Sequence, residues 1–255
     1  MLITNDDGVE APGLHALATA IAADDHDVVV VAPSGERSGS GAAIGRLHRS
    51  GPVAWTEVHW SDLPGVAVHS VDLPPAAAVY AGCLGAFGAR PDVVASGVNP
   101  GLNYGHLVIH SGTVGAAVTA AVLGVPAIAV SVGWGEQEEW TTAAGLASCA
   151  LPWLATASPG TALNLNVPNV PAAEVLGVRP ARLGPFNEVW SATTSAGELL
   201  LEYVGHDHEP EPDTDLAIVR SGYAAVTVLD GPGGDDVRAR AAADAIATAN
   251  GRAAA

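Results

Sequence analysis

Residues 1–8 read Met1-Leu2-Ile3-Thr4-Asn5-Asp6-Asp7-Gly8, an apolar run that gives way at once to acidic and turn-forming residues. The next apolar run, Val28 to Ala32, is continuous and β-branched, which is typical of a strand buried on both faces. Between them Pro12 stands where a helix can begin, and apolar residues recur at helical spacing from Leu14 to Ile21. This order of strand, helix and strand predicts the first unit of a parallel sheet.

The same alternation continues through the first two thirds of the chain. Further strands are expected at 51–58, 66–70, 93–96, 127–132, 163–167 and 224–229, and helices at 74–87, 113–123, 139–155 and 235–250. We therefore expect an α/β fold with a mostly parallel sheet and helices on both faces, and by length the 255 residues could form one large domain or two small ones. The pattern loosens over residues 180–214, where short strand-like pieces such as 199–203 indicate an irregular arm or an oligomer contact.

The charge balance excludes several classes of protein. The net charge is −17, and the basic residues are ten arginines with no lysine. Binding to a nucleic-acid duplex through a basic surface is therefore not expected. A Walker A phosphate-binding loop and Schiff-base catalysis both require a lysine, so both are excluded. An anionic substrate would have to be attracted locally, by a metal ion, backbone N–H groups or Arg37.

The hydrophobic content of 49% is ample for a buried core. The apolar runs are far shorter than the roughly 20 residues that a membrane-spanning helix needs, so no membrane association is expected. The chain opens on a strand without the features of a secretory signal, which predicts a cytoplasmic protein. In that compartment Cys83 and Cys149, both in apolar segments, are expected to be buried free thiols.

The adjacent carboxylates of Asp6 and Asp7 follow the first predicted strand, and ligands of open α/β sheets bind at the carboxyl ends of strands. Two ionised carboxylates repel one another unless a cation or strong hydrogen-bond donors stabilise them. The pair is therefore a candidate metal site. The alternative is that residues Asn5 to Gly8 form an ordinary turn or helix cap, for which Asn, Asp and Gly are common.

Two further loops follow predicted strands and can open on the same edge of the sheet. The loop 33–45 is rich in glycine and serine, which allow close backbone approach and can ligate a hard cation; a flexible surface loop is the alternative. The loop 97–112 ends at Ser111, Gly112 and Thr113, where a helix N-terminus favours an anion such as phosphate. The alternative there is a simple helix cap.

Two histidines within the loop 97–112, His106 and His110, are candidate proton donors at neutral pH. A lone histidine is more often structural, and the sequence does not decide whether either of them takes part in proton transfer.

Four motifs occur in order along the chain: Thr4-Asn5-Asp6-Asp7-Gly8-Val9-Glu10-Ala11-Pro12-Gly13-Leu14, Val31-Ala32-Pro33 leading to Arg37-Ser38-Gly39, Ser96-Gly97-Val98-Asn99-Pro100-Gly101, and Ser111-Gly112-Thr113-Val114. In order and spacing they strongly resemble the SurE family of nucleotidases. Weaker likeness at 163–168, 213–215 and 222–223 extends the resemblance over almost the whole chain.

The resemblance implies a metal-dependent phosphomonoesterase that hydrolyses nucleoside 5′- or 3′-monophosphates, with a Rossmann-like core and subunits joined as dimers or tetramers through C-terminal arms. Residues 180–214 would be that arm. By motif, one divalent cation, Mg²⁺ or Mn²⁺ because its ligands are all oxygen, would be held by Asp6, Asp7, Ser38 and Asn99. Asp6 and Asp7 would be catalytic, and the substrate would be bound by Asn5, Asn103, Ser111, Gly112 and Thr113.

Several positions depart from the family pattern. His110 stands where a tyrosine commonly precedes the Ser-Gly-Thr motif, and Ser70 to Pro74 replaces a familiar Gly-Thr-Pro segment. Two alternatives therefore stay open: a specialised phosphatase acting on a non-nucleotide phosphomonoester, and a non-catalytic nucleotide-binding regulator. The sequence does not give the preferred base, the 5′ or 3′ position, the metal or the number of subunits.

Overall fold

The computed structural model describes residues 1–45, 51–135, 137–185, 188–206 and 209–230, so the helix expected at 235–250 lies outside the described residues. The strands are β1 (Leu2–Thr4), β2 (Val29–Pro33), β3 (Trp55–Val58), β4 (Ala67–Val71), β5 (Val94–Pro100), β6 (Ala127–Val132), β7 (Thr161–Val167), β8 (Val178–Pro180), β9 (Glu188–Ser195), β10 (Glu198–His206) and β11 (Ala224–Asp230). The α-helices are α1 (Pro12–Ala22), α2 (Pro75–Cys83), α3 (Gly112–Val122), α4 (Trp140–Leu154) and α5 (Asp215–Arg220), with 3₁₀ helices η2 (Gly105–Ile109) and η3 (Ala172–Glu174).

Within these residues, one nine-stranded sheet has the order β3-β4-β2-β1-β5-β6-β7-β11-β8. Its central strands are parallel, and the antiparallel pairs are β3 with β4 and β11 with β7. Strand β1 lies between β2 and β5, so the three strand ends singled out in the sequence are neighbours on one edge. The prediction of a mostly parallel α/β sheet is confirmed.

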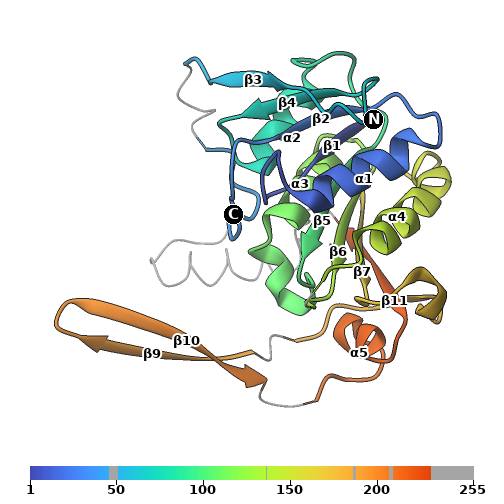
Figure 1. Ribbon diagram of the computed structural model, residues 1–255. Coiled ribbons are helices and arrows are strands. Elements are labelled where there is room, and N and C mark those ends of the chain that lie inside the picture. Colours follow the sequence, from blue (N-terminus) through green and yellow to red (C-terminus); the bar gives the residue numbers. More distant parts are fainter. Residues whose placement is uncertain (46–50, 136, 186–187, 207–208, 231–255) are drawn as a thin grey trace, which may run out of the picture.

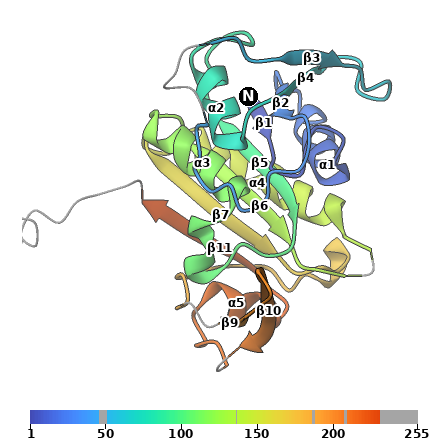
Figure 2. The same cartoon turned by 90° about the vertical axis from the view of Figure 1, so that its left-hand side faces the viewer.

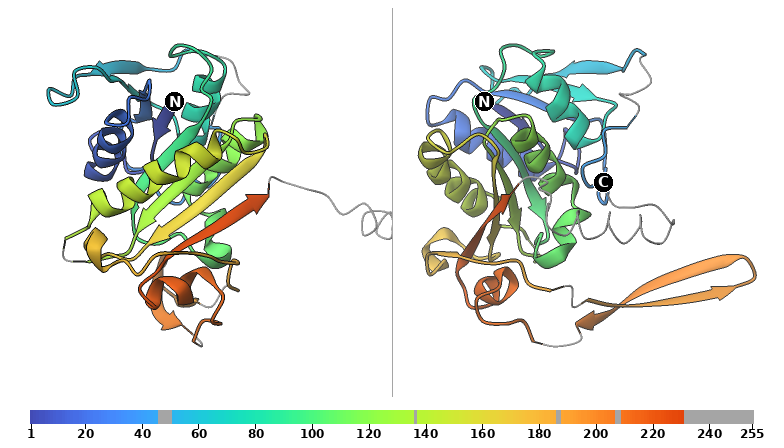
Figure 3. Two further views of the ribbon diagram at one scale, coloured as in Figure 1. Left: turned by 90° about the vertical axis from the view of Figure 1, so that its right-hand side faces the viewer. Right: turned by 180° about the vertical axis from the view of Figure 1, so that it is seen from behind.

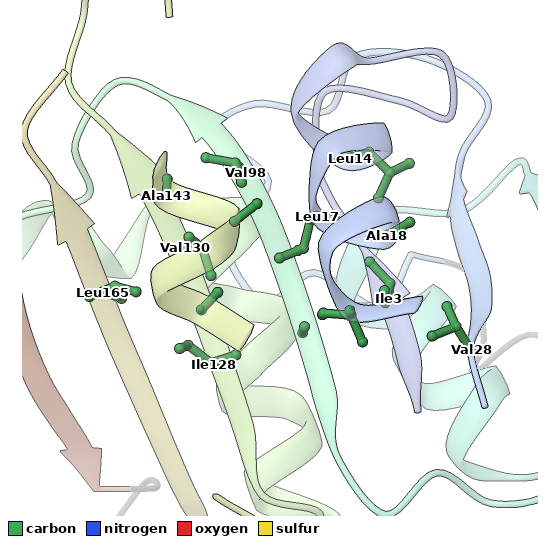
Figure 4. Packing of buried hydrophobic residues seen from close by; sticks show 14 of the residues in the cluster. Ile3, Leu14, Leu17, Ala18, Val28, Val98, Ile128, Val130, Ala143 and Leu165 are labelled. Carbon is green, nitrogen blue, oxygen red and sulfur yellow. The ribbon is translucent and has the colours of Figure 1, made fainter. Parts of the chain in front are cut away.

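Helices cover both faces of the sheet because successive strand residues point to opposite sides. Ile3, Val30 and Val130 belong to a buried cluster with α1 and α4 (Figure 4). Their sequence neighbours Leu2 and Val31 belong to a second cluster with α2 and α3. Figure 2 shows α1 and α2 on opposite sides of the strands.

The apolar stripe predicted in α1 is the face that the helix buries, and Leu14, Leu17, Ala18 and Ile21 are completely inaccessible to solvent. Each of the three larger side chains contributes about 1.5 to 3 kcal/mol through burial. Alanines line the inner faces of α3 and α4, so these helices lie close to the sheet.

Some predicted boundaries were wrong. Strand β5 runs on to Pro100, because Asn99 and Pro100 pair with β6, and η2 occupies part of the predicted loop 97–112. Helix α2 ends at Cys83 rather than at 87, and strand β3 begins at Trp55 rather than at 51. Helix α5 and strand β8 were not predicted; both are short, and β8 is exposed.

Residues 188–206 form the hairpin of β9 and β10, which extends away from the sheet in Figures 1 and 3. Three consecutive leucines of β10, Leu199 to Leu201, are exposed. At its base Arg182 is bonded to Glu211 and Asp213, which holds the two ends of the segment 180–214 together. An apolar hairpin held in this way is a surface that another chain can cover.

In the part of the chain that the structure describes, no helix is long and apolar enough to cross a membrane.

Cys83 is a buried free thiol as expected, and burial raises its pKa. The same expectation was wrong for Cys149, which is exposed on α4.

Candidate active site

Two backbone hydrogen bonds join the three predicted loops at the carboxyl edge of the sheet. The N–H of Arg37 donates to the carbonyl oxygen of Asp6 at 2.6 Å, which attaches the loop after β2 to the loop after β1. The N–H of Gly41 donates to the carbonyl oxygen of His110 at 3.0 Å, which attaches the same loop to the start of α3. Segments far apart in the sequence therefore surround one place.

Thr113 connects Asp6 with Asn99. Its hydroxyl donates a short hydrogen bond to Oδ1 of Asp6 and lies 3.4 Å from Oδ1 of Asn99. The amide nitrogen of Asn99 donates to the carbonyl oxygens of Pro100 and Gly101, at 3.3 and 2.7 Å, which turns its oxygen toward Thr113. Two predicted metal ligands and one predicted substrate-binding residue thus lie together, from β1, β5 and α3.

Gly112 permits this close approach. A Cβ at this position would lie 2.7 Å from Oδ2 of Asp6 and 2.7 Å from Oγ of Ser40. The backbone N–H groups of Gly112 and Thr113 also stabilise the Asp6 carboxylate. The positive end of α3 is therefore directed at Asp6.

Burial dominates the electrostatics of the two aspartates. It raises the pKa of Asp6, against the opposing effect of the bonds from Thr113 and Gly112. Burial, the charge of Asp6 and the charge of Glu36 raise the pKa of Asp7 to about 7. Within the described residues, Oδ2 of Asp7 is buried without a hydrogen-bond partner. A cation bound between the two carboxylates would favour their ionised forms.

Ser38 is exposed, and its hydrogen bond runs from the backbone N–H to Glu36 at 3.2 Å. Its place among the metal ligands therefore stays a prediction that rests on the position of its loop. Ser111 acts as the helix cap, accepting from the N–H of Val114 at 3.1 Å.

Asn5 is completely buried and donates to the carbonyl oxygen of Gly8 at 2.9 Å, so it closes the turn that carries the aspartates. His106 and His110 are both exposed. The two histidine side chains are accessible to solvent, whereas the buried side chain of Asn5 stabilises the turn that carries Asp6 and Asp7.

Asn103 is held over the ends of β6 and β7. Its side-chain amide donates to Oγ of Ser131 at 2.8 Å, and its backbone N–H donates to Oδ1 of Asn166 at 2.9 Å. Its carbonyl oxygen accepts from the amides of Asn164 and Asn166, at 2.7 and 2.8 Å. Since Ser131 pairs with Asn99 in the sheet, Asn103 lies beside the Asp6 and Asn99 cluster, and its amide carries a second proton besides the one donated to Ser131.

A cavity of about 730 Å³ beside α1 contains none of the predicted site residues. Its charged groups are the carboxylates of Glu10 and Asp62, and His15 is paired with Asp62 at 3.0 Å. Such a lining repels a phosphate dianion. The cluster around Asp6 also carries carboxylates, but it lies at the N-terminus of α3 and is therefore the better site for phosphate chemistry.

Comparison with known proteins decides the family. The model of the family described as "Survival protein SurE" matches residues 1–188. The chain belongs to the SurE family. Proteins named "5'/3'-nucleotidase SurE" from Photorhabdus laumondii and Salmonella typhimurium are each 38% identical to it over 237 residues, covering 90% of this chain and 89% of theirs. One of the same name from Serratia proteamaculans is 36% identical over 256 residues, covering 97% of this chain and 95% of its own.

The structural comparison gives the same family. The crystal structure of the SurE protein from Aquifex aeolicus matches this fold with a TM-score of 0.79 at 28% identity, covering 96% of this chain and 98% of that one. The resemblance found from the four motifs is confirmed, and so is the fold class that it implied.

In this SurE-family chain the motif analysis assigned no role to Asp215, whose side chain is completely buried. Its carboxylate accepts from the N–H groups of Gly105 and Leu216, at 2.8 and 2.9 Å, and from that of Gly184 at 3.4 Å. It thereby ties η2, next to Asn103, to the base of the arm. A lone aspartate in an unpredicted short helix gave no signal beyond the weak likeness at 213–215.

Replacing Asp215 with asparagine is expected to lower the free energy of unfolding at neutral pH by about 1 to 3 kcal/mol. The new amide nitrogen would face a buried N–H donor that has lost its acceptor. Urea unfolding measured by circular dichroism checks this, with Asp213→Asn, an exposed neighbour, as a comparison. Equal stability of the Asp215 variant and the wild type would contradict it.

The wild type and the Asp215→Asn variant also test how the free energy of unfolding depends on pH. Burial raises the pKa of Asp215 above its ordinary value of 3.8, so the folded chain binds this proton more tightly than the unfolded chain. The resulting stabilisation is fully present below the unfolded pKa and is lost as pH rises through the folded pKa. Asparagine does not titrate. The free energy of unfolding of the wild type is therefore expected to exceed that of Asp215→Asn by a growing margin as pH falls from about 7 to about 5.

Proposed function

We propose that this chain is a phosphomonoesterase of the 5′/3′-nucleotidase type, which hydrolyses nucleoside 5′- or 3′-monophosphates to a nucleoside and phosphate. The observation that carries the proposal is the contact of Thr113 with both Asp6 and Asn99, in a chain whose relatives are named 5'/3'-nucleotidases. It brings a carboxylate oxygen and an amide oxygen from two strand ends to the N-terminus of a helix, which is a suitable place for a phosphate ester.

The residues present fit a divalent cation. Asp6 and Asp7 are adjacent, burial raises both of their pKa values, and Oδ2 of Asp7 is buried without a partner among the described residues. The described residues hold no cluster of three or more His, Cys, Asp or Glu side chains suited to a metal ion. The remaining ligands would therefore be the neutral oxygens of Asn99 and Ser38, and an all-oxygen set suits Mg²⁺ or Mn²⁺. When bound there, the cation would neutralise phosphate charge and act as a Lewis acid.

The chain's own residues would then position the reacting groups. Asp6, fixed by Thr113 and by the helix N-terminus, would be the principal ligand, while Asp7 would accept a proton from the attacking water. The side-chain amide of Asn103 donates one proton to Ser131, and the other can be donated to a phosphoryl oxygen as negative charge develops. Gly112 keeps the helix end close enough to support this arrangement.

We also propose that residues 1–255 form one domain and that residues 180–214 are an arm joining subunits into a dimer or a tetramer. The support is the projecting β9 and β10 hairpin with its exposed leucines, held at its base by Arg182. Light scattering of the whole chain and of a Leu200→Glu variant tests this, since a charge on the apolar hairpin is expected to weaken the assembly.

Removing divalent metal is expected to abolish phosphate release from nucleotides, and adding Mg²⁺ or Mn²⁺ back is expected to restore it. Colorimetric phosphate assays on a panel of nucleoside 5′- and 3′-monophosphates and small sugar phosphates, with and without a chelator, make the measurement. Full activity after chelation would contradict the metal dependence. Turnover of a sugar phosphate but not of any nucleotide would replace the nucleotidase with a specialised phosphatase, and nucleotide binding without turnover would indicate a regulatory protein.

A further inference from the structure

Trp134 is an exposed aromatic side chain at the catalytic edge of the sheet. It lies two residues beyond the end of β6 and leaves 74% of its surface accessible, more than the other exposed tryptophans of the described residues, Trp55 and Trp153. In β6, Ser131 and Val132 pair with Asn99 and Pro100 of β5. Continued by one residue, this register places Gly101 opposite Gly133, the neighbour of Trp134.

The indole is in contact with Gly101. An ideal Cβ on Gly101 would lie 2.6 Å from Nε1 of Trp134 and 2.7 Å from Cε2, so only glycine leaves room for the ring. Gly101 also has a φ of +102°, a conformation that favours glycine. Its carbonyl oxygen accepts from the side chain of Asn99 at 2.7 Å. One residue thus contacts both the indole and a predicted metal ligand.

The loop that carries Trp134 is held in place from the next strand. Gly133 donates to the carbonyl oxygen of Val167 at 2.9 Å. The side chain of Asn169 accepts from the N–H of Glu139 at 2.7 Å and donates to the carbonyl oxygen of Gln137 at 3.0 Å. These bonds hold Gly133, the residue before Trp134, and the segment from Gln137 to Glu139 that leads into α4.

We propose that Trp134 is a specificity-determining residue that stacks on the base of a nucleotide whose phosphate lies at Asp6, Asn99 and Thr113. This inference rests on the proposed nucleotidase function and adds the place of the base. A ring that is 74% exposed beside Gly101 offers surface to a planar ligand, and stacking on an aromatic side chain accepts every base. It also needs no positive charge, which suits a chain of net charge −17.

The test compares the Michaelis constants of the metal-loaded full chain, its Trp134→Ala variant and its Trp134→Phe variant. For purine nucleoside monophosphates, Trp134→Ala is expected to raise KM about 5- to 100-fold with kcat nearly unchanged, the range that stacking of one base corresponds to. Pyrimidine nucleotides are expected to lose less, because their ring is smaller. Trp134→Phe is expected to restore most of the affinity.

Two controls separate stacking from loss of structure. Glycerol 2-phosphate, which carries no ring, is expected to give the same kcat/KM in all three proteins. Trp153→Ala, which removes a similarly exposed indole from α4, is expected to leave nucleotide KM unchanged. Inhibition by free adenosine is expected to weaken in Trp134→Ala in parallel with KM.

The outcomes distinguish this inference from the function on which it rests. Wild-type nucleotide turnover with the same KM in Trp134→Ala overturns the stacking role and leaves the nucleotidase standing. An equal loss of activity toward glycerol 2-phosphate also overturns it, because it would show a general disturbance of the site. A wild-type chain that releases phosphate from no nucleotide overturns both proposals.

Discussion

Asp6→Asn is expected to lower kcat/KM for nucleoside monophosphates on the order of 10³-fold, which is the size of effect seen when a preorganised charge-stabilising group is removed. Asp6 is the residue on which the site converges. It accepts from Thr113, contacts Gly112, and its backbone oxygen holds the loop of Arg37. An amide of the same shape keeps the packing but removes the negative charge proposed to hold the cation.

The fold of this variant is expected to survive. Burial raises the pKa of Asp6, so the surroundings disfavour its charge, and the side-chain oxygen of asparagine can still accept the hydrogen bond from Thr113. Phosphate release, circular dichroism and urea unfolding measure the two effects separately. Asp62→Asn, the same change at an exposed residue, is the matched control and should keep full activity. Wild-type activity in Asp6→Asn would remove the proposed site.

Gly115→Ala is expected to have the second large effect, on stability and activity together. A Cβ on Gly115 in α3 would lie 2.2 Å from the carbonyl oxygen of Gly41 and 2.7 Å from the nitrogen of Ala42. These are backbone atoms, so the loop after β2 must move away from α3. Such overpacking costs roughly 1 to 3 kcal/mol, which corresponds to a fall in Tm of about 3 to 10 °C in a chain of this length.

Movement of that loop also disturbs the site, because the same loop donates to Asp6 through Arg37 and contributes Ser40 beside Gly112. A displacement near 1 Å can cost about 10²-fold in rate, so kcat/KM is expected to fall by one to two orders of magnitude. Thermal unfolding and phosphate release are the two measurements.

Gly145→Ala supplies the matched control for this prediction. Gly145 also lies inside a helix, α4, but a Cβ there would meet nothing within 4 Å. Alanine is the better helix former by about 0.5 to 1 kcal/mol, so this variant should be slightly more stable and fully active. If Gly115→Ala behaved in the same way, α3 and the loop after β2 would not be in the contact described.

The parallel sheet and the edge at which the three loops meet were predictable because their signals are local. Runs such as 28–32 and 127–132 indicate buried strands by composition alone, and the order of strands and helices determines that their carboxyl ends share an edge. The helix boundary at Cys83 and the length of β5 were less predictable. They depend on a turn and on pairing with β6 that no short window of sequence contains.

The amino-acid sequence by itself determined the family, the α/β class and the edge at which Asp6, Asn99 and Thr113 meet, since four spaced motifs and a hydrophobic alternation are written along the chain. Only the tertiary structure decided that Thr113 contacts both other residues, that Asp215 ties η2 to the arm, and that Trp134 lies against Gly101. Those are contacts between segments distant in sequence. They depend on the register of the sheet and on side-chain packing, which exist only after the chain has folded.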